Sequence, residues 1–498
     1  GAPLARPSAA ALAHAEGAAE ALWWHDGASG WRTRGAVAAG GAARPAPVGT
    51  GEPWVPWSHV LDDSEAPYYR WFHGARTNAC FNCVDRHLLE GRGADVALTS
   101  LPEEETRGTG GVEPTSLTRR QLALAVAAAA RALRDDHGLR PRDRVLLHMP
   151  TDERAVVWAL ACARLGVVYS ATSVDTVEGV LRKRAEDLQP AVALAPDAPV
   201  AHGGADVDCA AKLSRAAPSV PVLRLPPVVP GEACGRMTDA EAYEALHAAA
   251  PPAPVAADHP LLVSYTSGST GPPKGVVHGH GGYAWGCLST MRSVFGAEAG
   301  EGAMLTVGSL GWITGQSYML FGPMLAGVRT VLMVGSPVHP TPLRLAEAVE
   351  RERCTMLQTG SAVVRQLMTD PANAARLDAT DTSSLRVATF CAEPVSREVH
   401  EYAHAHLTDR FVNSYWATEH GSVVFSRDVR PGAPPIAPDT RAWPLPWVAC
   451  ELDGATSDVV LTAPWPSLGL TVLGDLGRIR EPGWRGDLAR YERSYFPR

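Results

Sequence analysis

A loop rich in hydroxyl groups and glycines, followed by a lysine, is the part of this sequence best suited to bind phosphate. Residues 264–278 read SYTSGSTGPPKGVVH, an apolar run that continues into the loop and Lys274. Glycines let backbone N–H groups approach phosphate oxygens, hydroxyl groups donate further hydrogen bonds, and a lysine adds a point charge. The spacing Gly268-x-x-Gly271-x-x-Lys274 is not that of a Walker A loop. Composition alone also allows a flexible Ser/Gly loop, but the specific order of residues favours phosphate binding.

Lysine is scarce in the chain, and this scarcity draws attention to Lys274. Of the 45 basic residues, only Lys183, Lys212 and Lys274 are lysines. The net charge of −8 lacks the cationic excess of a general nucleic-acid binder. No apolar run approaches the roughly 18 residues of a membrane span. We therefore expect neither a nucleic-acid nor a membrane partner.

Five stretches of the sequence resemble one enzyme family and keep the order of its motifs. The loop at 264–278 resembles the phosphate-binding signature of the AMP-forming adenylate synthetases, which include acyl-CoA synthetases, peptide-synthetase adenylation domains and luciferases. The other four are similar to the short-chain branch, above all the acetyl- and propionyl-CoA synthetases. They are RWFHGARTNACFNCVDRH at 70–87, HGHGGY at 278–283, GWITGQSY at 311–318 and NSYWATEHG at 413–421. The resemblance covers about residues 51–498.

This resemblance implies a two-step reaction. A short-chain carboxylate (propionate or acetate) attacks the α-phosphorus of Mg-ATP to give an acyl adenylate and pyrophosphate, and the CoA thiol then displaces AMP. Such chemistry requires positioning and charge neutralisation more than covalent catalysis. Lys274, Thr418 and Glu419 match the catalytic groups, and Glu419 would hold Mg²⁺, which prefers carboxylate oxygen. The residues matched to ATP binding are Thr266, Ser267, Gly268, Ser269, Thr270, Gly271, Lys274, Ala392, Glu393, Pro394, Asn413, Ser414, Tyr415, Trp416, Ala417 and Thr418.

Trp416 determines the expected substrate size. In the acetate and propionate branch a tryptophan at this position closes the acyl pocket, and Ile313, Thr314 and Cys391 would line the same pocket. The alternative for Trp416 is a core aromatic, but its place within the motif favours the pocket. For the histidines of HGHGGY, a structural turn is favoured over a metal pair.

Several departures from the family concern CoA. They predict that CoA binds more weakly than ATP. The family's two arginines for the CoA phosphates are replaced here by His202 and Ala205, which removes the guanidinium groups best suited to phosphate. The other departures are residues 170–173 (SATS in place of a Gly-Gly-Phe-Ser type turn), Val338, Ala392 and Ala417.

The end of the sequence differs from the family as well. Gly474-Asp-Leu-Gly-Arg478 looks like the ribose-binding aspartate motif, but it precedes residues 488–496, which resemble the stretch before the true motif. We therefore do not assign Asp475 to the ribose. No lysine follows Lys274, so we expect the small lid domain and its catalytic lysine to be missing from this chain. Two alternatives stay open: a catalytically degenerate nucleotide-binding or interaction module, and an adenylating enzyme that loads a carrier-protein thiol.

Alternating strand-like and helical runs must position these residues. Such alternation predicts an α/β fold, with two parallel-rich sheets flanked by helices and a smaller β subdomain. A helix is expected from Leu117 to His137, and a second with Thr151 as its cap that ends before Gly166. The predicted strands are 144–149, 167–169, 221–225, 261–265, 304–307, 330–334, 385–390 and 411–416, and 343–353 is a further helix.

Composition suggests four segments. Residues 1–50 are an Ala/Gly/Pro-rich extension, expected to pack poorly although its tryptophans hint at docking; 51–250 and 251–428 form two α/β subdomains, and 429–498 a β-rich one. The lone Cys80-x-x-Cys83 pair among nine cysteines favours incidental thiols over zinc and a reducing compartment. We predict a cytoplasmic location, with an organelle as the alternative.

Overall fold

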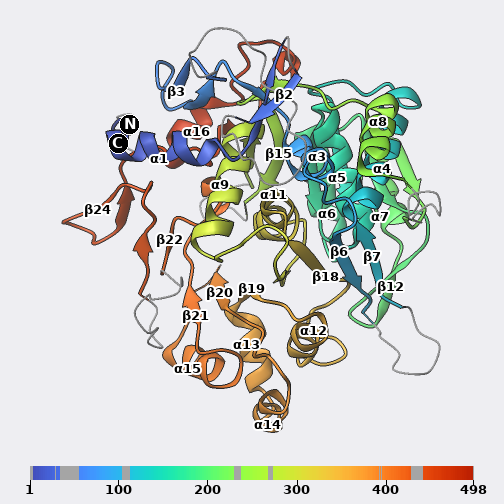
Figure 1. Ribbon diagram of the computed structural model, residues 1–498, viewed down its shortest axis with the longest axis vertical. Coiled ribbons are helices and arrows are strands. Elements are labelled where there is room, and N and C mark those ends of the chain that lie inside the picture. The colour runs from blue at the N-terminus through green and yellow to red at the C-terminus, as the bar shows by residue number, and fades with distance from the viewer. Residues whose placement is uncertain are drawn as a thin grey trace.

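The computed structural model describes residues 4–27, 30–33, 55–103, 113–228, 237–266, 273–391, 393, 395–427 and 441–496. Within these residues two seven-stranded sheets are flanked by helices, which confirms the predicted α/β class (Figure 1). The first sheet has the order β13 (Val222–Leu225), β10 (Val192–Pro196), β8 (Arg144–His148), β9 (Val168–Thr172), β15 (Pro260–Tyr265), β16 (Gly275–Gly279) and β26 (Thr471–Val472). The second has the order β21 (Phe411–Asn413), β20 (Val387–Cys391), β19 (Met356–Gly360), β17 (Ala303–Thr306), β18 (Arg329–Met333), β6 (Val96–Leu101) and β7 (Thr115–Thr118).

Both sheets are mainly parallel. The exceptions are the pairs β15–β16, β16–β26 and β6–β7, which are antiparallel. The remaining strands form two-stranded pairs: β1 (Trp23–Asp26) with β2 (Gly30–Thr33), β3 (His59–Asp62) with β4 (Arg70–His73), β5 (Arg76–Thr77) with β14 (Val255–Ala256), β11 (Val200–His202) with β12 (Ala205–Val207), β22 (Phe425–Ser426) with β23 (Trp443–Pro444), and β24 (Cys450–Leu452) with β25 (Val459–Leu461).

Helices cover the two sheets, and α12 to α15 gather with β19 to β21 in the lower part of Figure 1. The helices are α1 (Ala9–Ala19), α2 (Ala79–Cys83), α3 (Asp85–Leu89), α4 (Arg119–Asp135), α5 (Glu153–Leu165), α6 (Glu178–Leu188), α7 (Cys209–Ala216), α8 (Asp239–Ala249), α9 (His280–Ser293), α10 (Ile313–Gly315), α11 (Gly322–Ala326), α12 (Arg344–Glu352), α13 (Ser361–Met368), α14 (Ala372–Asp378), α15 (Arg397–His406) and α16 (Leu488–Tyr495). Other helical segments are the π-helix η2 (Gln316–Phe321) and the short 3₁₀ helices η3 (Thr418–His420) and η4 (Leu476–Arg478).

The predicted strands and helices are found within a few residues of their expected bounds, with two informative differences. Asp152, not Thr151, caps α5, because its carboxylate accepts a hydrogen bond from the N–H of Ala155 (3.1 Å). The strand predicted at 411–416 ends at Asn413, since the backbone of Tyr415 turns away to pair with Phe425. The early end of this strand leaves residues 414–421 as a loop.

The amino-terminal segment packs against the core, so the expectation of a poorly packed extension is wrong for its described part. Trp24 is fully buried, the N–H of Trp23 donates to Asn82 (2.8 Å), and the indole N–H of Trp285 in α9 donates to the carbonyl of Ala15 (2.9 Å). The docking role expected of the tryptophans is therefore observed.

The two sheets exchange strands across residue 250. β15 and β16 belong to the first sheet although they follow α8, and β6 and β7 belong to the second sheet although they precede α4. The four predicted segments stay a prediction, but their boundaries do not coincide with the sheets.

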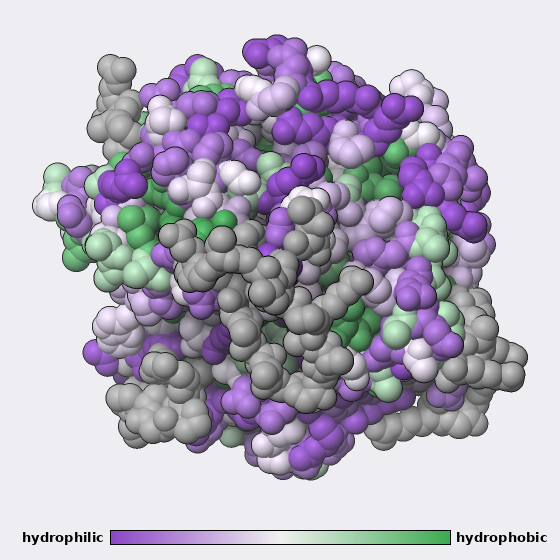
Figure 2. Space-filling view, turned by 45° about the horizontal axis from the view of Figure 1, so that its top comes forward, coloured by the Kyte–Doolittle hydropathy of each residue, from purple (hydrophilic) through white to green (hydrophobic). Residues whose placement is uncertain are grey.

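Hydrophilic residues cover most of the face in Figure 2, with separate hydrophobic patches between them. Among the described helices, none combines the length and apolar character needed to cross a bilayer. Cys80 and Cys83 lie in α2 as buried free thiols, and burial raises the pKa of Cys80 to about 12.

Candidate active site

The phosphate loop predicted from the sequence joins the antiparallel strands β15 and β16. Its base is closed by a hydrogen bond from the N–H of Thr266 to the carbonyl of Lys274 (3.0 Å). Antiparallel pairing therefore places these two residues opposite each other at the root of the loop. The predicted residues Ser267, Gly268, Ser269, Thr270 and Gly271 lie outside the described residues.

Residues 413–421 form the opposite wall of the site. Ser414 is tied to the sheet because both its N–H and its hydroxyl donate to the carbonyl of Phe390 (3.0 Å each). The next side chain, Tyr415, is 56% exposed, whereas Trp416 is only 7% exposed. The loop thus presents one aromatic ring to solvent and buries the next.

Thr418 and Glu419 lie in η3, which is fixed by its backbone carbonyls. His278 Nε2 donates to the carbonyl of Thr418 (2.9 Å), and the N–H of Gly469 donates to the carbonyl of Glu419 (2.7 Å). Burial lowers the pKa of His278 to about 4, so this imidazole is neutral near pH 7. Because the backbone carbonyls hold the turn, neither the Thr418 hydroxyl nor the Glu419 carboxylate is needed to fix it.

Glycines allow the segment around 466–469 to reach this turn. A Cβ on Gly282 of α9 would lie 2.0 Å from the carbonyl oxygen of Pro466, and one on Gly421 would lie 2.4 Å from that of Ser467. Gly421 also has φ +73°, a conformation that L side chains rarely adopt. The glycines of the HGHGGY and NSYWATEHG motifs are therefore required for close backbone packing behind Glu419.

The histidines of HGHGGY have separate partners. His278 bonds Thr418, whereas His280 Nδ1 accepts from the N–H of Ala79 (3.1 Å) at the start of α2. This arrangement is that of the structural turn favoured by the sequence.

The residues predicted to line the acyl pocket come together. The thiol of Cys391 accepts a hydrogen bond from Gln358 Nε2 (2.9 Å) and has the side chains of Thr314 and Trp416 as neighbours. Burial raises the pKa of this thiol, so it is uncharged. The ring of Trp416 meets the ring of Tyr318 edge-on at 5.2 Å, and Ile313 is buried in the same core cluster.

Glu393, predicted to contact adenine, is engaged with the protein. Its carboxylate accepts from the N–H of Ala362 in α13 (2.9 Å) and pairs with Arg365 (2.8 Å), and Arg365 lowers its pKa. The carboxylate therefore anchors this turn to α13. The neighbouring predictions Ala392 and Pro394 lie outside the described residues.

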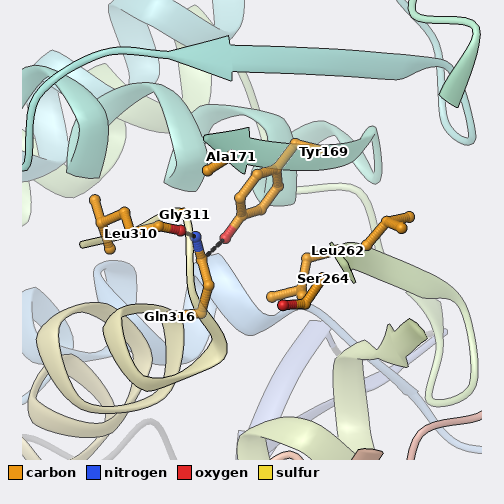
Figure 3. A pocket seen from close by; sticks show the side chains of 8 residues that line it. Tyr169, Ala171, Leu262, Ser264, Leu310, Gly311 and Gln316 are labelled. Carbon is orange, nitrogen blue, oxygen red and sulfur yellow. Dashed lines mark hydrogen bonds between the residues drawn. The ribbon is translucent and has the colours of Figure 1, made fainter. Parts of the chain in front are cut away.

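A small pocket adjoins this region and was not foreseen from the sequence. It lies among β9, β15 and the loop that leads into α10, and the hydroxyl of Tyr169 points at Gln316 across it (Figure 3). That hydroxyl donates to Gln316 Oε1 (2.5 Å), and Gln316 Nε2 donates to the carbonyl of Leu310 (2.5 Å). The motif GWITGQSY contains Gln316, but nothing in the sequence pairs it with Tyr169.

Comparison with known proteins assigns the family. Residues 91–460 match the family described as AMP-binding enzyme, and residues 54–83 match the acetyl-coenzyme A synthetase N-terminus. The chain belongs to the AMP-binding enzyme family. This result confirms the resemblance to the AMP-forming adenylate synthetases.

Several curated relatives within the family are named acetyl-coenzyme A synthetase. The protein of Mycolicibacterium smegmatis is 32% identical over 476 residues, covering 88% of this chain and 49% of the relative. That of Ralstonia nicotianae is 31% identical over 471 residues (89% and 67%), and that of Mycobacterium bovis 32% over 456 residues (86% and 68%). The chain thus spans about half of the first relative and about two thirds of the other two.

A buried carboxylate, that of Glu103, lies beneath the hairpin expected to contact the CoA phosphates in this AMP-binding enzyme. His202 and Ala205 lie on the β11–β12 hairpin, and the N–H of Gly203 at its tip donates to Glu103 (2.6 Å). The same carboxylate accepts from the N–H of Ser336 (2.6 Å). A buried negative charge beneath the hairpin disfavours a phosphate there.

Asp475 lies at the surface in the left-handed region (φ 49°), immediately before η4. Its carboxylate lies 3.5 Å from Arg478 Nη1. The exclusion of Asp475 from the ribose site stays a prediction.

Proposed function

We propose that this chain activates a short-chain carboxylate with Mg-ATP and passes the acyl group to CoA, as the core of an AMP-forming acyl-CoA synthetase. The observation that carries the proposal is the loop at 413–421. Five consecutive residues of this loop, 415–419, include an exposed aromatic ring, a buried indole and the carboxylate of Glu419. Family membership and the names of the relatives support the same reaction.

Each group has a role that its chemistry suits. Lys274, at the exit of the loop, would neutralise phosphate charge, and Tyr415 would pack against the adenine. Glu419 would hold Mg²⁺, which when bound neutralises charge on the phosphates. Thr418 would lie beside the α-phosphate. Glu393, bound to α13, would shape the adenine turn through the backbone rather than through its carboxylate.

The wall made by Thr314, Cys391 and Trp416 would admit acetate or propionate and exclude longer acids. The buried edge-on packing of Trp416 against Tyr318 leaves the indole little freedom to move aside.

Calorimetric titration tests this function. Mg-ATP and a stable sulfamate analogue of propionyl adenylate are added to the wild-type chain, to Lys274→Met and to the control Lys183→Met, whose lysine is exposed on α6. We expect the analogue to bind more tightly than ATP, and Lys274→Met to weaken Mg-ATP binding while Lys183→Met does not. If the wild-type chain binds neither ligand, the enzyme proposal fails, and a degenerate interaction module becomes the better account.

A second acceptor is favoured by the carboxylate of Glu103 beneath the hairpin at 202–205. In this alternative the acyl group passes to a carrier-protein thiol, which has no 3′-phosphate to be repelled. Acyl transfer to CoA, dephospho-CoA and a phosphopantetheinylated carrier protein separates the two. A clear preference for CoA over dephospho-CoA supports the first acceptor, and a preference for the carrier supports the second.

A further inference from the structure

The last described helix, α16, lies against both walls of the proposed nucleotide site. Arg490 Nη2 donates to the carbonyl of Pro273 (3.3 Å), the residue before Lys274. The hydroxyl of the buried Tyr491 donates to the carbonyl of Gly469 (2.5 Å). The N–H of Gly469 in turn donates to the backbone carbonyl of Glu419. The helix is therefore fixed relative to the root of the phosphate loop and to η3.

This docking brings Tyr495, at the end of α16, among three residues assigned to Mg-ATP. The ammonium of Lys274 lies 5.4 Å from the centre of the Tyr495 ring. Thr266 and the carboxylate of Glu419 are neighbours of the Tyr495 hydroxyl. A cation over the face of a tyrosine is attracted by the ring, so the contact orients Lys274.

Two hydroxyl groups in this cluster are buried without a well-formed hydrogen bond. Thr266 Oγ1 and the Tyr495 hydroxyl oxygen are both buried, and neither has a hydrogen-bond partner of good geometry among the described residues. A tyrosine hydroxyl can both donate and accept a hydrogen bond. Buried polar groups are normally paired, so two buried hydroxyls without well-formed bonds, beside a lysine and a carboxylate, suit a polar ligand.

We propose that Tyr495 is a further residue of the nucleotide site: its ring orients the Lys274 ammonium, and its hydroxyl, with that of Thr266, donates to a phosphate oxygen of the bound nucleotide. The identity of the ligand rests on the proposed function, whereas the contact with Lys274 does not. A ring that only packs α16 onto the protein is the competing explanation.

The scarcity of lysine allows the ring contact to be tested without nucleotide. An amine-reactive reagent is applied to the wild-type chain, Tyr495→Phe and Tyr495→Leu, and the labelling rate of each of the three lysines is followed by mass spectrometry. We expect Tyr495→Leu to raise the rate at Lys274 by about threefold relative to the exposed Lys183, and Tyr495→Phe to leave it unchanged because the ring is kept. Equal rates at Lys274 in all three proteins would overturn the orienting role.

The hydroxyl contact is tested with two probes, Mg-ATP and adenosine. Loss of one hydrogen bond to a charged acceptor weakens binding by about tenfold, so Tyr495→Phe should lose that factor for Mg-ATP and nothing for adenosine. Arg493→Ala, an exposed change on the same helix, should alter neither. Unchanged Mg-ATP binding, or equal weakening of both probes, assigns Tyr495 a packing role and refutes the hydroxyl contact. If the wild-type chain binds no nucleotide, the proposed function and the hydroxyl contact both fail, while the labelling rates still decide the contact with Lys274.

Discussion

Replacement of Trp416 by glycine tests whether this indole limits the length of the acyl chain. The side chain is 7% exposed and lies against Tyr318, with Cys391 and Thr314 as neighbours of the same wall. Loss of a buried tryptophan costs about 3–5 kcal/mol of folding free energy. We therefore expect Trp416→Gly to be less thermostable than the wild type but to enclose an apolar space next to the acyl carbon.

The size of the effect follows from what fills that space. Each methylene group transferred from water into it contributes about 0.8 kcal/mol, or about fourfold in affinity. A hexanoyl chain has four more methylene groups than an acetyl chain, so full burial favours the longer chain by about 200-fold in the variant. In the wild type the indole occupies this volume, and lengthening the chain should weaken binding.

The assay is calorimetry with stable adenylate analogues that carry acetyl, propionyl and hexanoyl groups. Trp443→Gly is the matched control, because Trp443 is 54% exposed on β23 and stacks with Arg427. We expect the order of affinities to reverse only in Trp416→Gly. If a folded Trp416→Gly protein, verified by its thermal transition, keeps the wild-type order, Trp416 is a core aromatic and does not bound the pocket.

Three further predictions concern the metal, the turn and the acceptor. Glu419→Gln should weaken ATP binding by about tenfold in Mg²⁺ and leave it unchanged in EDTA, as measured by calorimetry, because only the metal needs the carboxylate; equal loss in both buffers would contradict this. The folded pKa of His278, about 4, lies below the unfolded value of 6.5, so its neutral form contributes stability that is complete above pH 6.5 and is lost as the pH falls toward 4. Urea unfolding between pH 7.5 and 4.5 should accordingly show a loss that is smaller in His278→Gln by up to about 3 kcal/mol, and an identical loss in both proteins would refute it. Ala205→Arg should improve CoA over dephospho-CoA by about fivefold in transfer assays, since a guanidinium pairs with phosphate; no change would place the 3′-phosphate elsewhere.

Local signals were enough to predict most elements of the fold. The end of α5, for example, follows from Gly166, which adopts φ 69° there, whereas the predicted cap Thr151 lies one residue before the observed cap Asp152. Information of this kind lies within a few residues of the feature it controls. It could not show that Trp24 is buried or that Ala15 accepts a bond from Trp285, because these contacts join segments far apart in the chain.

In the candidate site, too, local motifs predicted some residues, whereas others depend on contacts between distant segments. Thr314, Cys391 and Trp416 were predicted because each belongs to a recognisable motif, and the structure brings them together. Tyr495 belongs to a stretch that was noticed, but its place beside Lys274 depends on how α16 docks. The pairing of Tyr169 with Gln316 was missed for the same reason, since it links the start of β9 to η2, 147 residues later.

The docking of α16 depends on backbone packing behind the candidate site. Gly282 and Gly421 let the segment at 466–469 lie against α9 and η3, since side chains at either position would collide with its carbonyls. The segment then uses the N–H of Gly469 for Glu419 and the carbonyl of Gly469 for Tyr491. One residue thus links the turn of the proposed metal ligand to the helix of Tyr495. A shift of this segment would move both together, so the positions of Glu419 and Tyr495 are mechanically coupled although 75 residues separate them.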